Sequence, residues 1–194
     1  KPAVETAAKL QEEKEPQGSW PAPLRPLEIR IYPYLHFHEA MDNKIKKIPV
    51  YVAINAISKP MQHAVVATED RRFYDHGGID FQGVLRAVYA AVESKMHGSN
   101  KRAQGASTIT QQVAKNFLLS ADQTIDRKVK EAILSFRIEQ TYSKDKILEL
   151  YLNRVYFGSG AYGVEAAAQR YFNKSARSVT IAEAAMLAGL VQAP

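Results

Sequence analysis

Beyond residue 58 the hydrophobic side chains of this sequence recur at the spacing of α-helices. Between residues 81 and 96 they return every three or four positions, which is the period of one helical face. Asp80 immediately precedes this stripe as a candidate N-cap. The members of the stripe are Phe81, Val84, Leu85, Val88, Val92 and Met96.

Three further helices are predicted in the same way. One has an apolar stripe made of Val129, Ala132, Ile133 and Phe136. Another follows Ser143 and carries Ile147, Leu148, Leu150 and Tyr151. The last helix begins at Thr180, because Glu183 stands three residues later and the two residues form a capping-box pattern.

Alternation of apolar and polar residues, which is typical of strands, occurs only before residue 58. The alternating residues are Leu27, Ile29 and Ile31, and then Ile48, Val50, Val52 and Ile54. We therefore predict a small β element over residues 27–57. Residues 1–26 combine charge with proline and are predicted to be a flexible linker, and residues 58–194 form the core. The predicted fold class is mainly α with a small N-terminal β element.

Composition narrows the function only slightly. The 194 residues carry a net charge of +6 with a pI near 9.4, which favours anionic partners such as phosphorylated substrates, membrane surfaces or polyanions. The chain has no cysteine, so no disulfide supports the fold. The longest apolar run, residues 184–191, is far shorter than the roughly 20 residues that span a bilayer. The chain begins with Lys1, and we interpret it as a fragment of a longer protein.

Candidate chemistry lies in three polar blocks within the helical region, at residues 69–80, 105–116 and 127–131. Glu69 follows the apolar run 64–67, and an acid held against apolar surface suits a general base. The competing interpretation is a solvated carboxylate at a helix end. Glu131 is a second acid, and it stands beside Arg127 and Lys128 at helical spacing. A plain solvated helix face is the alternative there.

The middle block has more hydrogen-bonding groups than one helix cap requires. Its hydroxyl and amide residues are Ser107, Thr108, Thr110, Gln111 and Gln112. We interpret them as a cradle for sugar hydroxyls or phosphate oxygens at a helix N-terminus, with a solvated helix start as the alternative. The sequence contains no Ser-x-x-Lys, Gly-x-Ser-x-Gly or P-loop pattern, which excludes those forms of serine acyl transfer and phosphoryl transfer from this segment.

The three blocks, with two more, resemble the five ordered motifs of the family 51 glycosyltransferase domain of bacterial peptidoglycan synthases. The motifs begin at Glu69-Asp70, Gly105, Arg127-Lys128, Leu148-Glu149 and Glu183. The resemblance covers roughly residues 58–194 and includes class A penicillin-binding proteins and monofunctional transglycosylases. It implies a lysozyme-like helical domain that ends beyond residue 194.

The resemblance also implies a reaction. Such a domain polymerises lipid II into β-1,4 glycan strands by inverting displacement of undecaprenyl diphosphate. Glu69 resembles the base, and Glu131 the acid beside the diphosphate. Residues expected to bind substrate are Asp70, Ser107, Thr108, Gln111, Gln112, Lys115, Asn116, Arg127, Lys128, Asn153 and Tyr156. A divalent cation, Mg²⁺ or Mn²⁺, is a candidate cofactor at the diphosphate, whereas a protein metal site is left undetermined.

The partners implied are lipid II, the growing lipid-linked strand and the outer leaflet of the cytoplasmic membrane. This domain is expected at the outer face of the cytoplasmic membrane, which is its periplasmic side. A transmembrane anchor and a C-terminal transpeptidase domain are expected to lie outside this chain. The stripe of residues 81–96 is the expected membrane contact. No nucleic-acid partner is expected.

Two other classes remain open at this point. A lysozyme-like glycan hydrolase or lytic transglycosylase would also use a carboxylate in a helical fold, but it gives no reason for cations around the second acid. A basic helical binding module is the other alternative. Against it, stacking aromatics are not interleaved with the cations as single-stranded nucleic acid requires.

Overall fold

A computed structural model describes residues 36–96, 107–119 and 125–192 of the chain. The chain divides between Asn43 and Lys44 into two compact units. The second unit contains every residue of the candidate site.

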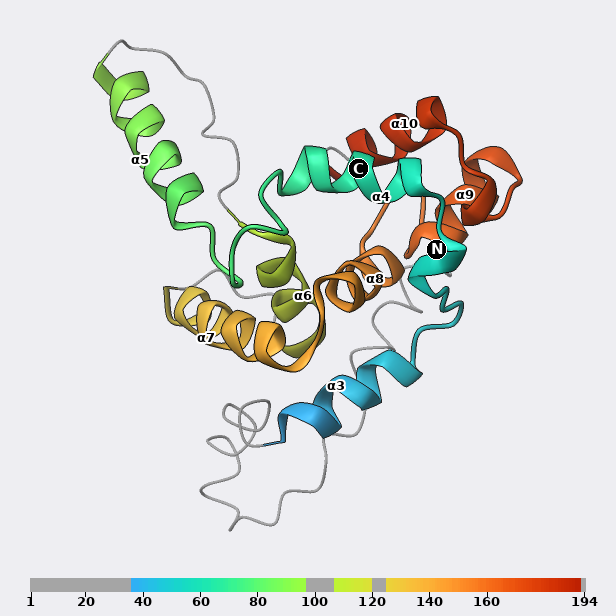
Figure 1. The fold of residues 1–194 in the computed structure, drawn as a ribbon, viewed down its shortest axis with the longest axis horizontal. Coiled ribbons are helices and arrows are strands. Elements are labelled where there is room, and N and C mark those ends of the chain that lie inside the picture. Colours follow the sequence, from blue (N-terminus) through green and yellow to red (C-terminus); the bar gives the residue numbers. More distant parts are fainter. Residues whose placement is uncertain (1–35, 97–106, 120–124, 193–194) are drawn as a thin grey trace, which may run out of the picture. The chain divides into compact units, whose positions relative to one another are not determined.

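The described residues are mainly helical, which confirms the predicted fold class (Figure 1). The α-helices are α3 (Phe37–Lys46), α4 (Lys59–Glu69), α5 (Phe81–Met96), α6 (Ile109–Leu118), α7 (Ile125–Thr141), α8 (Lys144–Arg154), α9 (Val164–Phe172) and α10 (Ile181–Gln192). Two short 3₁₀ helices are η2 (Ile54–Ala56) and η3 (Ala176–Ser178). Within the described ranges the only β pairing is an isolated antiparallel bridge between Tyr156 and Tyr162.

The prediction of a small β element is wrong for the residues of it that the structure describes. Residues 48–53 form no strand, and the chain then enters η2. Pro49 interrupts the alternating run, and proline cannot donate to a strand ladder. The first predicted strand, residues 27–31, and the predicted linker, residues 1–26, lie outside the described residues. Between the two predicted strands the chain forms α3, in which buried Phe37 and Met41 are one helical turn apart.

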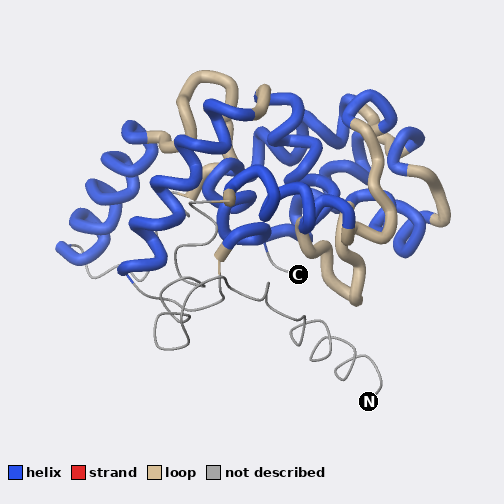
Figure 2. Tube along the Cα trace, turned by 90° about the horizontal axis from the view of Figure 1, so that it is seen from below, coloured by secondary structure: helices blue, strands red, loops and turns tan. Residues whose placement is uncertain are grey.

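The main contacts between helices of the second unit fall into two groups, one of which includes α6. Helix α6 contacts both α7 and α8, and α8 contacts α9 and η2. Helix α4 lies beside α10 (Figure 1). The described residues are drawn as helices and loops in Figure 2. The buried side chains Ile109, Val113 and Phe117 follow one face of α6. Because α6 contacts both α7 and α8, side chains from these helices can meet near its first turn.

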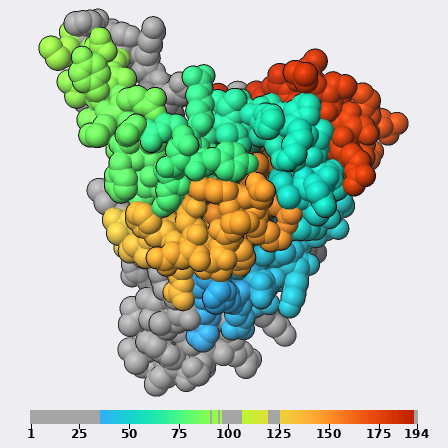
Figure 3. All heavy atoms as spheres, in the orientation of Figure 1, coloured from blue at the N-terminus to red at the C-terminus, as the bar shows by residue number. Residues whose placement is uncertain are grey.

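The start of α5 agrees with the predicted cap, since the backbone N–H of Gly83 donates to Asp80 at 2.9 Å. The apolar stripe of α5 is exposed instead of packed. Helix α5 is the light-green segment of the space-filling view (Figure 3). The exposed members are Phe81, Val84, Leu85, Val88, Val92 and Met96, with Tyr89 beside them. Among the described helices, none has the length and apolar character needed to cross a bilayer.

The buried face of α7 is not the predicted one. Val129, Ile133 and Phe136 are exposed. The buried positions are instead Arg127, Glu131, Leu134, Ser135 and Ile138. Arg127 and Glu131 are opposite charges one turn apart, so each compensates the charge of the other in the interior.

Candidate active site

Glu69 is the last residue of α4, and its side chain is half-buried. Its Oε2 accepts a hydrogen bond from the Gln112 amide nitrogen at 2.8 Å. Its Oε1 is buried and has no hydrogen-bond partner among the residues that the structure describes. An orphaned buried acceptor costs about 1–3 kcal/mol, so this oxygen has a strong tendency to take a donor.

Asp70 fixes the end of α4 against the start of α6. Its buried carboxylate accepts the backbone N–H of Ile109 at 3.0 Å. The Nε2 of His76 lies 3.0 Å from both carboxylate oxygens. A carboxylate at a helix N-terminus is stabilised by the helix dipole. Asp70 therefore positions its neighbour Glu69 beside the first turn of α6.

Glu131 is the second acid, and its side chain is only 2% exposed. Its Oε1 accepts from Lys128 Nζ at 2.8 Å, and its Oε2 accepts from Arg127. Lys128 also donates to Ser107 Oγ at 3.1 Å, immediately before α6. The Lys128 side chain is half-exposed, so a cation anchored on a buried acid faces solvent. This arrangement can bind an anionic group.

These residues do not by themselves build a metal site. Both oxygens of Glu131 are already engaged by cations. Across the described ranges, no three His, Asp or Glu side chains are grouped so that they could hold a metal ion. A single carboxylate that is neutralised by two cations is a poor ligand set for Mg²⁺ or Mn²⁺.

The polar run at the start of α6 is largely used inside the protein. Thr108 is the N-cap and forms a capping box with Gln111. The Thr108 hydroxyl donates to the Gly78 carbonyl at 2.6 Å, and buried Thr110 donates to Glu139 at 2.6 Å. Gln112 is the member of the run that contacts Glu69. The excess of hydroxyl and amide groups is thus explained in part by folding, while a role in substrate binding stays a prediction.

The other predicted binding residues are dispersed. Lys115 is exposed and Asn116 is half-buried on α6. Asn153 is buried, and its amide exchanges two hydrogen bonds of 2.8 Å with the backbone of Val52. Tyr156 is exposed, with its ring centroid 4.7 Å from that of Tyr162. Of this group, Asn153 has its amide engaged within the fold.

Sequence reasoning missed two charged clusters that support the site. Glu149 accepts from Tyr51, Lys146 and the backbone N–H of Ile54. Burial opposes ionisation, but these hydrogen bonds outweigh it and lower the pKa of Glu149. Burial and the Glu149 hydrogen bond raise the pKa of Tyr51 to about 12. Glu149 lies in the fourth motif, but its partner Tyr51 is 98 residues away and carries no local signal.

In the second missed cluster, Lys144 donates to Glu139 at 2.8 Å and to the His76 carbonyl at 2.6 Å. Its ammonium also lies 4.5 Å from the centroid of the Phe73 ring. Because Glu139 holds Thr110, these contacts join α6, α7, α8 and the turn after α4. In the sequence Lys144 resembles an ordinary charged residue, because its partners Glu139 and His76 lie on other elements of the fold.

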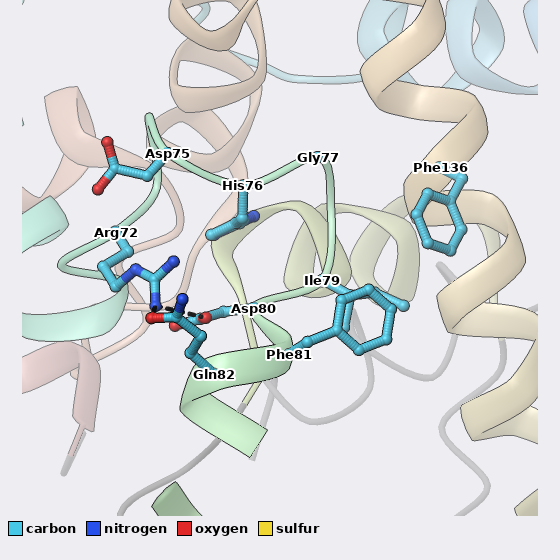
Figure 4. A pocket seen from close by; sticks show the side chains of 9 residues that line it. All are labelled: Arg72, Asp75, His76, Gly77, Ile79, Asp80, Phe81, Gln82 and Phe136. Carbon is cyan, nitrogen blue, oxygen red and sulfur yellow. Dashed lines mark hydrogen bonds and ion pairs between the residues drawn. The ribbon is translucent and has the colours of Figure 1, made fainter. Parts of the chain in front are cut away.

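A pocket of about 340 Å³ lies where the turn after α4 enters α5 (Figure 4). Phe81 and Phe136 stand on one side of it, and Arg72, Asp80 and Gln82 meet on the other. The Arg72 guanidinium lies 3.4 Å from Asp80, so these two charged groups of the pocket are paired with one another. None of the predicted site residues lines this pocket.

Comparison with known proteins places these features in a family. The sequence model described as "Transglycosylase" matches residues 38–194, and this chain belongs to that family. The recognition as a peptidoglycan glycosyltransferase domain is thereby confirmed.

The chain is 47% identical over 171 residues to penicillin-binding protein 1A of Rickettsia felis, covering 85% of this chain and 21% of that protein. It is 55% identical over 144 residues to penicillin-binding protein 1A of Neisseria lactamica, covering 74% and 17% respectively. The chain thus spans about a fifth of the length of these relatives.

Proposed function

We propose that this domain polymerises lipid II, the lipid-linked disaccharide-pentapeptide, into β-1,4 glycan strands by displacing undecaprenyl diphosphate. One observation supports this most directly. Glu69, a carboxylate with one oxygen that has no hydrogen-bond partner among the described residues, lies beside the start of α6. Lys128, a half-exposed cation held by Glu131, lies there too. A base and an anion-binding group are what a transfer from a diphosphate needs.

In the proposed step, the 4-hydroxyl of the incoming unit gives its proton to Oε1 of Glu69. The hydroxyl oxygen forms a bond to the anomeric carbon of the growing strand, and the bond from that carbon to the diphosphate oxygen breaks. A single displacement inverts the α-linked donor to a β-1,4 product. No covalent glycosyl-enzyme intermediate is required.

Negative charge develops on the departing diphosphate, and cations near it lower the barrier. We assign this role to Lys128, which faces solvent, with Lys115 as a further exposed cation on α6. Buried Glu131 holds Lys128 in place and is itself paired with buried Arg127. Gln111, Asn116 and Tyr156 remain proposed substrate contacts. The reaction as proposed has no step through a divalent cation, since both oxygens of Glu131 accept from these cations.

The lipid tail requires that the domain meet a membrane. The exposed apolar stripe of α5 supports membrane contact, with exposed Ile133 and Phe136 of α7 as additional apolar surface. An amphipathic helix buries such a face at the interface between head groups and acyl chains. We therefore propose that the domain works at the outer face of the cytoplasmic membrane.

The remainder of the protein is proposed from the relatives. The chain covers 21% of the Rickettsia felis protein and 17% of the Neisseria lactamica protein, which leaves room for an anchor and a transpeptidase domain. The hydrolase and binding-module alternatives are not favoured by the family match.

The direct test is Glu69→Gln in the full-length protein, assayed for glycan strands made from labelled lipid II. The change keeps the shape of the side chain and removes the base, so the rate should fall by on the order of 10²–10⁴. Glu39→Gln is a matched control, because Glu39 is an exposed acid of α3 outside the site. Turnover of Glu69→Gln within about tenfold of the parent would exclude Glu69 as the base.

A further inference from the structure

Three side chains form a chain of hydrogen bonds that ends on the proposed base. The hydroxyl of Tyr151 donates to Oε1 of Gln112 at 3.3 Å. The Nε2 of Gln112 donates to Oε2 of Glu69 at 2.8 Å. The three residues come from α8, α6 and α4, so the arrangement exists only in the folded domain.

The direction of these two hydrogen bonds matters because an amide side chain has an oxygen that accepts and an NH₂ group that donates. With its oxygen toward Tyr151, Gln112 presents its NH₂ group to Glu69, which is the end that an ionised carboxylate needs. With the amide reversed, two acceptor oxygens would face one another. A hydroxyl that donates to the amide oxygen also polarises the amide and strengthens its N–H as a donor.

Tyr151 is well suited to hold this orientation. Its side chain is completely buried on α8, so its hydroxyl has little freedom to move. Burial, with the nearby charge of Glu69, raises the pKa of Tyr151, and the hydroxyl therefore keeps the proton that it donates. The result is that Oε2 of Glu69 accepts a hydrogen bond from Gln112, whereas the buried Oε1 has no hydrogen-bond partner among the described residues.

We propose that Tyr151 is a positioning residue that acts through Gln112 to leave Oε1 of Glu69 as the single proton-accepting oxygen. This inference rests on the proposed function, because it assigns the base role to Glu69. It adds a residue that touches neither substrate nor the base and that selects which of two chemically equivalent oxygens reacts.

The first test is Tyr151→Phe in the full-length protein, which removes only the hydroxyl. We expect kcat for lipid II polymerisation to fall about tenfold, with KM within about twofold, since substrate contacts are unchanged. Tyr171→Phe is the matched control, because the Tyr171 hydroxyl donates to the Phe157 carbonyl at 2.9 Å in a different part of the fold. A parent-like kcat for Tyr151→Phe would overturn the proposal.

A double-mutant cycle tests whether Tyr151 acts through Gln112. In a Gln112→Ala background, adding Tyr151→Phe should cost nothing further, because the amide that it orients is already gone. A general packing role for Tyr151 would instead lower kcat by the same factor in both backgrounds. Additive losses would overturn the proposal.

A measurement that needs no turnover separates this inference from the proposed function. In protein labelled with ¹⁵N at glutamine side chains, the two Nε2 protons of Gln112 should give separate, slowly exchanging signals. In Tyr151→Phe these signals should broaden or exchange rapidly with solvent, whereas Tyr171→Phe should leave them unchanged. Unchanged Gln112 signals in Tyr151→Phe would overturn the inference even if the parent polymerises lipid II. The expected change in a parent that does not polymerise lipid II would leave the orientation in place and exclude only the reaction.

Discussion

The ammonium group of Lys128 lies 2.8 Å from Oε1 of Glu131, whose side chain is buried while that of Lys128 is half-exposed. The pair therefore behaves as one unit, in which the acid holds the cation at the surface. Exposed ion pairs contribute little to stability, but one anchored on a buried acid can orient a charge for binding. This relationship predicts a kinetic coupling between the two residues.

Lys128→Ala and Glu131→Gln should each slow single-turnover polymerisation severely, and the double variant should be little worse than the poorer single variant. Once the acid is lost the cation is no longer held, so removing it adds little. Rates of product formation at saturating lipid II measure the effect. Fully additive losses would mean that the two residues serve separate steps.

Asn153 should prove to be a structural residue. Asn153→Ala leaves both the N–H and the carbonyl of Val52 without their partner, so the free energy of unfolding should fall by about 1–3 kcal/mol. Denaturant unfolding measures this, with exposed Asn55→Ala as the control. An unchanged free energy of unfolding together with a raised KM would instead support the substrate contact that the sequence predicted.

The apolar face of α5 should control membrane binding. Replacing Leu85, Val88 and Val92, which are 70%, 57% and 52% exposed, with serine removes apolar surface that no core packing needs. Liposome flotation and use of long-chain lipid II should both fall, while turnover of a short-chain soluble analogue should change much less.

The control for this experiment is serine at Ile181 and Met186 of α10, which are also exposed apolar residues. Their replacement should leave flotation unchanged. Equal losses of activity on long-chain and short-chain substrates in the α5 variant would show that the stripe supports the fold instead of the membrane contact.

Acid should weaken the capping of α10. The hydrogen bond from Lys174, followed by those from Thr180, lowers the pKa of Glu183 from 4.5 to about 2. Because the folded value lies below the unfolded one, the stabilisation is complete above about pH 4.5 and is lost as the pH falls toward 2. Thermal unfolding of Glu183→Gln should therefore differ from the parent at about pH 6 and much less at about pH 2. A difference that stays constant across this range would contradict the assignment.

Local patterns in the sequence predicted helices α5, α7, α8 and α10, because caps and apolar periods lie within one or two turns. Helix α3 was not predicted, since it lies in the region assigned to the β element. The capping box of Thr180 and Glu183 forms as predicted, and Ser143 caps α8. The face that a helix buries was harder to predict. On α7 an ion pair between Arg127 and Glu131 occupies the interior where Ile133 was expected, and hydrophobic period alone cannot anticipate such a pair.

Hydrogen-bond partners far apart in sequence explain what else was missed. Residues 48–54 alternate like a strand, yet Val52 pairs with the side chain of Asn153, 101 residues away. The two acids and the cations beside Glu131 were singled out from sequence, but the hydrogen bond that holds Glu69 was not. Gln112 reaches Glu69 across 43 residues, and no local pattern distinguishes it from the adjacent Gln111, which caps α6.

The contacts of Asp70 link the assembly of the site to the docking of α6 during folding. Its carboxylate is shared between His76 and the first backbone N–H of α6, and Glu69 is its immediate neighbour. A partly folded chain in which α4 has formed but α6 has not docked would leave that carboxylate solvated and Glu69 unplaced. Recovery of activity during refolding should therefore follow docking of α6 instead of the earlier gain of helix, and no half-assembled form of the domain would be free to consume substrate.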